Sequence, residues 1–246
     1  MTERGDAWIV VAGAAGALGG ALAQYFGDQG RRVLALDRQF PAETSNRPEI
    51  TTSAVDLLVD DDVRRCIAQA TVSGRRVSLL INAVGLIWNE PILAMRDGKL
   101  AEHAVESWRN VIDANMTAAF IVAKQTAAHM AKHGGGCIVN FSSIASGGNP
   151  GQVAYSAAKA GIEGLTRAMA SELGPLGVRV NALALGFIDV ATTRNAVAEK
   201  RLSQYAEKTP LGRLGGVADV ISAVEFLASN TFVNGAIIPV DGGLRL

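Results

Sequence analysis

Trp8-Ile-Val-Val-Ala-Gly-Ala-Ala-Gly-Ala-Leu-Gly-Gly20 is an apolar run that passes directly into a glycine-rich turn. The unbroken apolar residues predict a buried strand, and Leu22, Ala23 and Phe26 predict a helix after the turn. Glycines let a diphosphate approach the backbone, and a helix N-terminus meets it with N–H groups and the positive end of the dipole. The order strand, glycine turn, helix favours a dinucleotide site, although a turn that only packs helix on strand would leave the same sequence pattern.

The next predicted strand ends in an acidic residue, Asp37, about 20 residues beyond the glycines. A carboxylate at that place can bind a ribose 2′-hydroxyl and would repel a 2′-phosphate. We therefore expect NAD(H) in preference to NADP(H). Arg38 leaves the alternative open, because a guanidinium beside the acid could accept a phosphate, and an ordinary turn residue is a further interpretation of Asp37.

Tyr155-Ser-Ala-Ala-Lys159 places a phenol and an ammonium four residues apart, on the same face of a predicted helix. A cation beside a phenol favours the phenolate and so lowers the phenol pKa. Upstream, the apolar run Cys137–Phe141 predicts a buried strand that ends at Ser142 and Ser143. A serine, a tyrosine and a lysine together indicate proton transfer at a carbonyl oxygen. An exposed Tyr–Lys pair on an amphipathic helix is the structural alternative.

Composition limits the classes of protein that remain. The chain has 246 residues, is 49 % hydrophobic and carries no net charge, which suits a globular domain and disfavours nucleic acid as a partner. Cys66 and Cys137 form neither a metal-ligand spacing nor a disulfide framework, so no metal is expected. We see neither a signal peptide nor a run long enough to span a membrane, which predicts a cytoplasmic location.

Strand and helix patterns alternate along the chain. This alternation predicts an α/β fold, a single-domain Rossmann-type doubly wound parallel sheet over residues 1–246 with helices on both faces. The strands are expected at 8–12, 33–37, 50–55, 77–82, 136–142, 178–184 and 236–240. The helices are expected at 17–29, 60–72, 104–131, 153–173, 193–207 and 216–228.

The order of motifs resembles that of the short-chain dehydrogenase/reductase family over essentially the whole chain. The matching positions are Gly13 to Gly19, Asp56, Asn82 to Gly85, Asn115, Ser143, Tyr155, Lys159, Asn181, Gly186 and Val240 to Gly243. The resemblance implies hydride transfer between a nicotinamide cofactor and a secondary alcohol or ketone. It also implies a homotetramer, a common assembly among relatives.

The resemblance assigns roles to individual residues. Tyr155 would exchange the proton with the substrate oxygen, and Lys159 would lower the tyrosine pKa and bind the nicotinamide ribose. Ser143 would hydrogen-bond the substrate, because Asn140-Phe-Ser-Ser143 matches the strand ending of the family; Ser142, which restores the usual spacing to Tyr155, is the alternative. Asn115 would interrupt the long helix and lead a water chain to the lysine. The implied cofactor-binding residues are Gly13, Gly16, Leu18, Gly19, Asp37, Asp56, Leu57, Asn82, Ala83, Gly85, Tyr155, Lys159 and Ile188.

Four positions of the chain depart from the family pattern. Ala12 and Ala17 stand where the glycine loop usually carries threonine and glycine, and Leu185 replaces a proline. Val190 replaces a threonine that would bind the carboxamide, and Thr192 and Thr193 are the alternative residues for that role. The segment 95–103 is longer than usual. A plain solvated loop is expected there, with a pocket edge or a subunit contact as alternatives.

The substrate is poorly specified by the sequence. The segment 187–214 is expected to close over the substrate and has few obvious charged residues to bind a charged substrate group. We therefore expect a secondary alcohol or ketone of moderate polarity. A 3-oxoacyl-type group is included, although no basic patch is seen for an acidic carrier. A redox sensor or scaffold that binds dinucleotide without turnover is the alternative. The apolar tail Leu244–Leu246 is expected to dock on a neighbouring subunit.

Overall fold

The computed structural model describes residues 7–40, 47–72 and 74–246, and these contain one large sheet with seven strands. All neighbouring strands are parallel, in the order β3-β2-β1-β4-β7-β8-β9. The strands are β1 (Trp8–Ala12), β2 (Val33–Asp37), β3 (Ile50–Ala54), β4 (Val77–Asn82), β7 (Gly136–Ser143), β8 (Val178–Leu185) and β9 (Ile237–Val240). The chain order reverses between β1 and β4, where doubly wound sheets open a crevice at the carboxyl ends of their strands.

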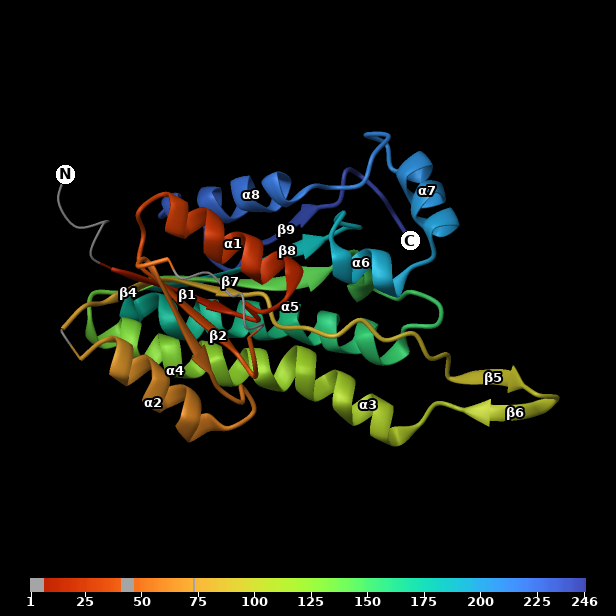
Figure 1. The fold of residues 1–246 in the computed structure, drawn as a ribbon, viewed down its shortest axis with the longest axis horizontal. Coiled ribbons are helices and arrows are strands. Elements are labelled where there is room, and N and C mark those ends of the chain that lie inside the picture. The colour runs from red at the N-terminus through yellow and green to blue at the C-terminus, as the bar shows by residue number, and fades with distance from the viewer. Residues whose placement is uncertain (1–6, 41–46, 73) are drawn as a thin grey trace.

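Helices cover both faces of the sheet (Figure 1). Helices α1 (Ala17–Asp28) and α8 (Val217–Ser229) lie on one face. Helices α2 (Asp60–Ala70), α4 (Ala118–Lys132) and α5 (Val153–Leu173) lie on the other. Two short 3₁₀ turns, Ile144–Gly147 and Gly174–Leu176, follow β7 and α5. The predicted doubly wound α/β fold is confirmed.

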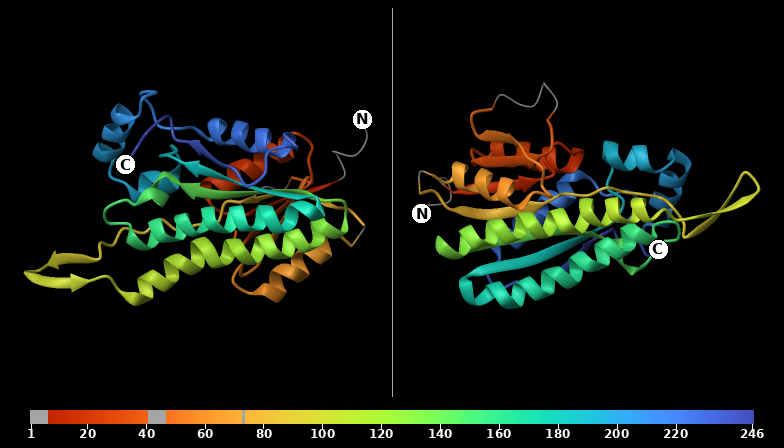
Figure 2. Two further views of the ribbon diagram at one scale, coloured as in Figure 1. Left: turned by 180° about the vertical axis from the view of Figure 1, so that it is seen from behind. Right: turned by 90° about the horizontal axis from the view of Figure 1, so that it is seen from below.

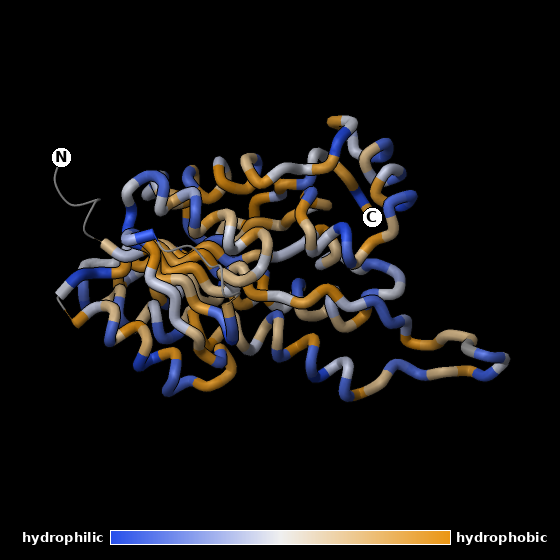
Figure 3. The backbone as a smooth tube through the Cα atoms, viewed as in Figure 1, coloured by the Kyte–Doolittle hydropathy of each residue, from blue (hydrophilic) through white to orange (hydrophobic). Residues whose placement is uncertain are grey.

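Strand β1 shows why the central strands are apolar throughout. Successive side chains of a strand point to opposite faces, so Trp8 and Val10 enter the core under α4 while Ile9 and Val11 enter the core under α1 and α8. Because helices cover both faces, neither set can be polar. The hydrophobic colouring of the sheet, with hydrophilic residues on the outer helices, follows this rule (Figure 3).

Two predicted helices are interrupted. The helix predicted at 104–131 is α3 (Val105–Ile112), a π-helical turn (Asp113–Thr117) and α4. The helix predicted at 193–207 is α6 (Ala191–Ala196) and α7 (Glu199–Lys208), separated by Val197 in extended conformation. The π-turn contains Asn115, where the family resemblance implies an interruption of the helix. Helical periodicity does not mark this turn, because the periodicity continues nearly unchanged through one widened turn.

The segment 95–103, predicted as a plain solvated loop, is largely exposed but has regular structure. A β-hairpin, β5 (Leu93–Arg96) and β6 (Lys99–Glu102), projects from the body of the protein (Figure 2). Its turn is Asp97-Gly98, with φ of 51° and 74°, the left-handed pair that a two-residue hairpin turn requires. At the base of the hairpin, hydrogen bonds from Trp88 and from the backbone of Ala104 lower the pKa of Glu90 to about 2.

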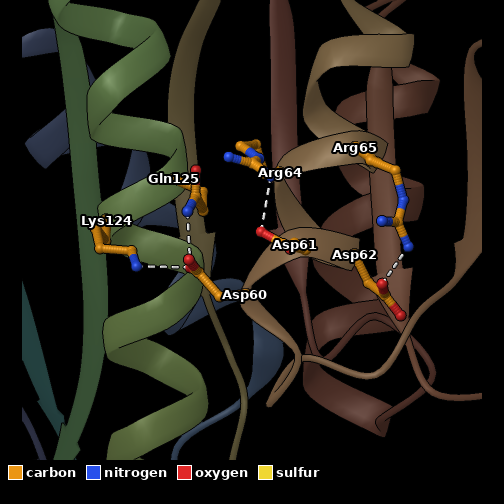
Figure 4. A network of polar contacts seen from close by, with 7 residues as sticks. All are labelled: Asp60, Asp61, Asp62, Arg64, Arg65, Lys124 and Gln125. Atoms are coloured by element: carbon orange, nitrogen blue, oxygen red, sulfur yellow. Dashed lines mark hydrogen bonds and ion pairs between the residues drawn. The ribbon is translucent and has the colours of Figure 1, made fainter.

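A polar network joins α2 to α4 at the surface (Figure 4). The Asp60 carboxylate accepts hydrogen bonds from Lys124 and Gln125 of α4, each at 2.7 Å. Asp61 and Asp62 also lie in the first turn of α2, where the helix dipole favours negative charge.

None of the helices in the described residues combines the length and apolar character that crossing a membrane requires.

Candidate active site

A cleft of about 450 Å³ opens at the carboxyl ends of the central strands. Its walls come from the glycine turn after β1, the loop after β4, the end of β7, the start of α5 and the segment after β8 through α6. The lining residues are Gly16, Ala17, Leu18, Gly19, Ala83, Val84, Gly85, Leu86, Ile87, Phe141, Ser142, Ser143, Tyr155, Lys159, Leu185, Gly186, Ile188, Val190, Thr192, Thr193, Asn195 and Ala196.

The glycine turn packs too closely for side chains at two of its positions. Gly13 has φ of 78°, and a Cβ there would lie 2.7 Å from the carbonyl oxygen of Ala83. A Cβ on Gly19 would lie 2.2 Å from the carbonyl oxygen of Gly13. Helix α1 begins after Gly16 with no side-chain cap, so its first N–H groups face the cleft without an intrahelical partner. This end of the cleft can bind a diphosphate.

The two serines at the end of β7 point in different directions. Ser142 is buried, and its hydroxyl donates to the backbone oxygen of Lys159 at 3.1 Å or to Glu163 at 3.0 Å. Ser143 is partly exposed and lines the cleft together with Tyr155. Because neighbouring side chains of a strand alternate, only one of the two can face the tyrosine, and it is Ser143.

Burial dominates the titration of the Tyr155–Lys159 pair. It raises the pKa of Tyr155 to about 12, with a hydrogen bond to Ser143 acting in the opposite direction. It lowers the pKa of Lys159 to about 8. The sequence predicted a tyrosine pKa lowered by the lysine. The structure differs because the Lys159 ammonium lies 5.5 Å from the phenol ring centre and donates to the carbonyl oxygen of Phe141 at 2.9 Å.

Asn115 fastens the loop after β4 to the π-helical turn. Its amide donates to the carbonyl oxygens of Leu86 and Val111, each at 2.9 Å, and its own oxygen accepts from the Leu86 N–H at 3.2 Å. A Cβ on Gly85 would lie 2.8 Å from this amide oxygen and 3.3 Å from the Lys159 nitrogen. Asn115 and Lys159 therefore approach the same glycine from two helices.

The structure does not bring every predicted cofactor residue to the cleft wall. Asp37 accepts a hydrogen bond at 3.0 Å from the N–H of Ala15 in the glycine turn, beyond the cleft lining. Asp56 caps the N–H of Leu58, and Leu57 is buried in the core under α4. Asn82 is buried and donates to the carbonyl oxygen of Ala119 at 2.9 Å, which joins β4 to α4.

The segment after β8 forms the remaining wall. Ile188 is buried beside the cleft, and Thr192 and Thr193 line it from the first turn of α6. Phe187 stacks on Tyr205 of α7, with ring centres 4.0 Å apart. A small side pocket beside Ser143 and Tyr155 is lined by Ile87, Ile144, Ala145, Asn149, Gln152, Gly186, Phe187, Thr193, Val197 and Leu246.

Comparison with known proteins assigns this architecture to a family. A family model described as enoyl-(acyl carrier protein) reductase matches residues 13–245. The curated 3-oxoacyl-(acyl-carrier-protein) reductase FabG of Thermotoga maritima is 32 % identical over 245 residues, covering 96 % of each chain. The chain belongs to the short-chain dehydrogenase/reductase family. It is an oxidoreductase that uses a nicotinamide dinucleotide, in a family where a catalytic tyrosine is typical.

Two solved structures superpose closely on this one. A putative gluconate dehydrogenase from Agrobacterium tumefaciens has a TM-score of 0.87 at 27 % identity, covering 98 % of this chain and 96 % of the other. ElxO with NADP bound has a TM-score of 0.86 at 25 % identity, covering 97 % and 98 %.

Sequence reasoning missed several groups that meet at the cleft of this short-chain dehydrogenase/reductase. The carbonyl oxygen of Phe141 binds the Lys159 ammonium, and Asn89, Gln152 and Ala196 are hydrogen-bonded across the cleft edge. No local pattern marks them, since each acts through residues far away in the sequence. The apolar tail was expected to dock on a neighbour. Leu244 is buried within its own chain and Leu246 is exposed, so docking of the tail on a neighbouring subunit stays a prediction.

Replacing Gly19 by alanine is expected to lower dinucleotide affinity by more than about tenfold and to destabilise the fold by about 2 kcal/mol. The added Cβ would overlap the carbonyl oxygen of Gly13, so the glycine turn must shift. Fluorescence titration with NADH and thermal unfolding measure the two effects. Gly164→Ala in α5 is the matched control, because a Cβ there meets nothing within 4 Å. Unchanged affinity in Gly19→Ala would contradict the assignment of this turn to the diphosphate.

Proposed function

We propose that the protein interconverts a secondary alcohol and a ketone, with Ser143, Tyr155 and Lys159 as the catalytic residues and NAD(H) as the preferred cofactor. One observation carries the proposal. These three side chains line one end of a cleft whose other end is an uncapped helix N-terminus behind a glycine turn. Proton-transfer groups and a diphosphate site therefore share a single cavity.

Tyr155 is the proton donor in the direction of reduction. With its pKa raised to about 12 by burial, the phenol is protonated at neutral pH and can give its proton to a carbonyl oxygen that gains charge. Ser143, at the end of β7, is hydrogen-bonded to Tyr155 and would bind the same substrate oxygen, which would fix the distance of that oxygen from the phenol. In the direction of oxidation, the phenolate must form, and the Lys159 ammonium on the next turn of α5 stabilises it.

Asn115 and Lys159 support the proton path behind the tyrosine. The Asn115 amide holds the Leu86 backbone and lies across Gly85 from the Lys159 nitrogen. We propose that a water relay starts at this asparagine and reaches the lysine, which restores the tyrosine proton after each turnover.

The residues present fit a nicotinamide dinucleotide. The glycine turn and the first turn of α1 would hold the diphosphate, Gly85 would admit the ribose beside Lys159, and Ile188 would face the nicotinamide with its backbone. Thr192 and Thr193 line the cleft, and one of their hydroxyls would replace that of the missing threonine at Val190. The bound cofactor supplies or accepts the hydride, and the protein supplies alignment and polarity.

The residues that line the side pocket indicate the class of substrate. Ile87, Phe187 and Val197 form an apolar wall next to Ser143 and Tyr155, and the Asn149 and Gln152 amides lie on the polar side. We propose a ketone with one apolar substituent, and the curated 3-oxoacyl-(acyl-carrier-protein) reductase relative makes a 3-oxoacyl group the first candidate to assay.

A preference for NADH over NADPH is expected because the Asp37 carboxylate would repel a 2′-phosphate. Asp37→Asn is expected to weaken NADH binding and to reduce the NADH/NADPH preference by about tenfold, since the charge is removed while the side chain keeps an acceptor for the Ala15 N–H. Fluorescence titration with both cofactors at matched salt measures the change.

The opposite preference in the unmodified protein would show that Arg38 binds the phosphate and overrides Asp37. The bound NADP in ElxO makes this a real alternative for the family. Arg38→Ala then serves as the matched variant, and its loss of NADPH affinity would identify the binding group. A homotetramer and a cytoplasmic location stay predictions from the sequence and its resemblance.

A further inference from the structure

Three side-chain amides form a chain of hydrogen bonds across one edge of the cleft. The Asn149 amide donates to the Gln152 side-chain oxygen at 2.8 Å, and the Gln152 amide donates to the Asn89 side-chain oxygen at 2.8 Å. The Asn89 amide then donates to the carbonyl oxygen of Ala196 at 3.3 Å. This series of hydrogen bonds starts in the loop after β7 and ends at the last residue of α6.

The direction of this chain is fixed by its final acceptor. A backbone carbonyl can only accept, so Asn89 must turn its NH₂ group toward Ala196 and its oxygen toward Gln152. Gln152 must then offer its NH₂ group to Asn89 and its oxygen to Asn149. All three amides are therefore oriented by one backbone oxygen of α6.

The hydrogen bonds connect two different walls of the cleft, that of Gln152 and that of Ala196. Gln152 is 9 % exposed and directly precedes α5, the helix of Tyr155 and Lys159. The Glu90 N–H donates to the Gly151 carbonyl oxygen at 2.8 Å, which fixes residues 89–90 beside the start of α5. Ala196 belongs to the segment after β8 and lines the cleft on its other side.

Arg194, the charged residue of α6, does not make this connection. Its guanidinium binds Asp189 at 2.6 and 2.9 Å and Glu199 at 3.3 Å. Both partners lie on the same segment as α6, so these pairs shape the segment without joining it to the opposite wall. The Asn89–Ala196 hydrogen bond does join the two walls.

We propose that Asn89 is a positioning residue that latches α6 over the cleft in register with the helix of Tyr155 and Lys159. The inference rests on the proposed function of the cleft. The acceptor half of the Asn89 side chain is held by Gln152, and its donor half holds α6. Loss of the Asn89 NH₂ group should release α6 and weaken substrate binding, while proton transfer stays intact.

Asn89→Asp separates the two halves of this side chain. The carboxylate still accepts from Gln152, but it cannot donate to Ala196 and repels that carbonyl oxygen. We expect hydrogen exchange over residues 191–197 to become about threefold to tenfold faster, and KM for the ketone to rise by about the same factor. The kcat of reduction and its pH profile should stay within about twofold of the unmodified enzyme, because the latch does not touch the proton path.

Two further variants make the result specific. Asn110→Asp, at an exposed position of α3, adds the same charge away from the latch and should leave exchange and KM unchanged. Asn89→Ala removes the latch without adding charge, so it serves if the aspartate variant does not fold. It should also release α6.

The outcomes distinguish the latch from the proposed function. Exchange over 191–197 that stays at the unmodified rate in both Asn89 variants overturns the latch. A similar rise in exchange throughout α5 and the sheet also overturns it, because Asn89 would then be a general structural residue. Faster local exchange in a protein that reduces no ketone would support the latch and remove the proposed function.

Discussion

Tyr155→Phe is expected to lower the kcat of ketone reduction by about 1,000-fold, the size of a general acid's contribution. The substitution removes the phenol proton and keeps the ring that packs beside Lys159. Dinucleotide affinity should therefore change by less than about twofold. Steady-state kinetics and a fluorescence titration on the same preparation measure the two quantities.

The matched control is Tyr25→Phe. The Tyr25 hydroxyl donates to Glu225 at 2.8 Å, on the α1–α8 side of the sheet and away from the cleft lining, so its loss should leave turnover unchanged. Retained turnover in Tyr155→Phe would remove Tyr155 as the acid and with it the mechanism proposed above. Retained biological output without turnover would instead favour a dinucleotide sensor.

Lys159→Met is expected to lower kcat by about 100-fold and to remove an inflection in the pH profile. Because burial lowers the pKa of Lys159 to about 8, the ammonium is present below that pH and lost above it. In the unmodified enzyme, kcat/KM for reduction should therefore fall as pH rises through about 8. A profile that keeps this inflection in Lys159→Met would assign it to another group.

The same substitution is expected to stabilise the fold. The folded pKa of Lys159, about 8, lies below its ordinary value of 10.5, so charging this lysine at neutral pH costs folding free energy. Lys159→Met should raise the free energy of unfolding at pH 7 by about 2 kcal/mol, after allowance for the lost hydrogen bond to Phe141.

The pH dependence of that stabilisation has a defined sign. Between pH 8 and 10.5 the unfolded chain binds more protons than the folded one, so the stability contribution of Lys159 rises with pH in this window. The difference in the free energy of unfolding between Lys159→Met and the unmodified protein should therefore shrink above pH 8. Denaturant unfolding at pH 7 and 9.5 measures it, and a variant less stable than the parent at pH 7 would contradict the prediction.

Local patterns predicted a large part of the fold. The strand β1, the glycine turn and α1 are encoded within a short stretch, because steric room for a backbone and an apolar strand are properties of neighbouring residues. The Asp97-Gly98 hairpin was also encoded locally, and the interpretation of residues 95–103 as a solvated loop overlooked the turn type that this pair favours.

The sequence by itself determined the doubly wound sheet, the glycine turn and the order of Ser143, Tyr155 and Lys159, since alternation, helical spacing and glycine content act over a few residues. The tertiary structure alone decided the pKa values of Tyr155 and Lys159 and the hydrogen bonds across the edge of the cleft. Burial raised the tyrosine pKa and lowered the lysine pKa, and the chain from Gln152 through Asn89 to Ala196 joined distant segments. Desolvation and hydrogen bonds between distant residues depend on which segments pack together, and no short stretch of sequence specifies that.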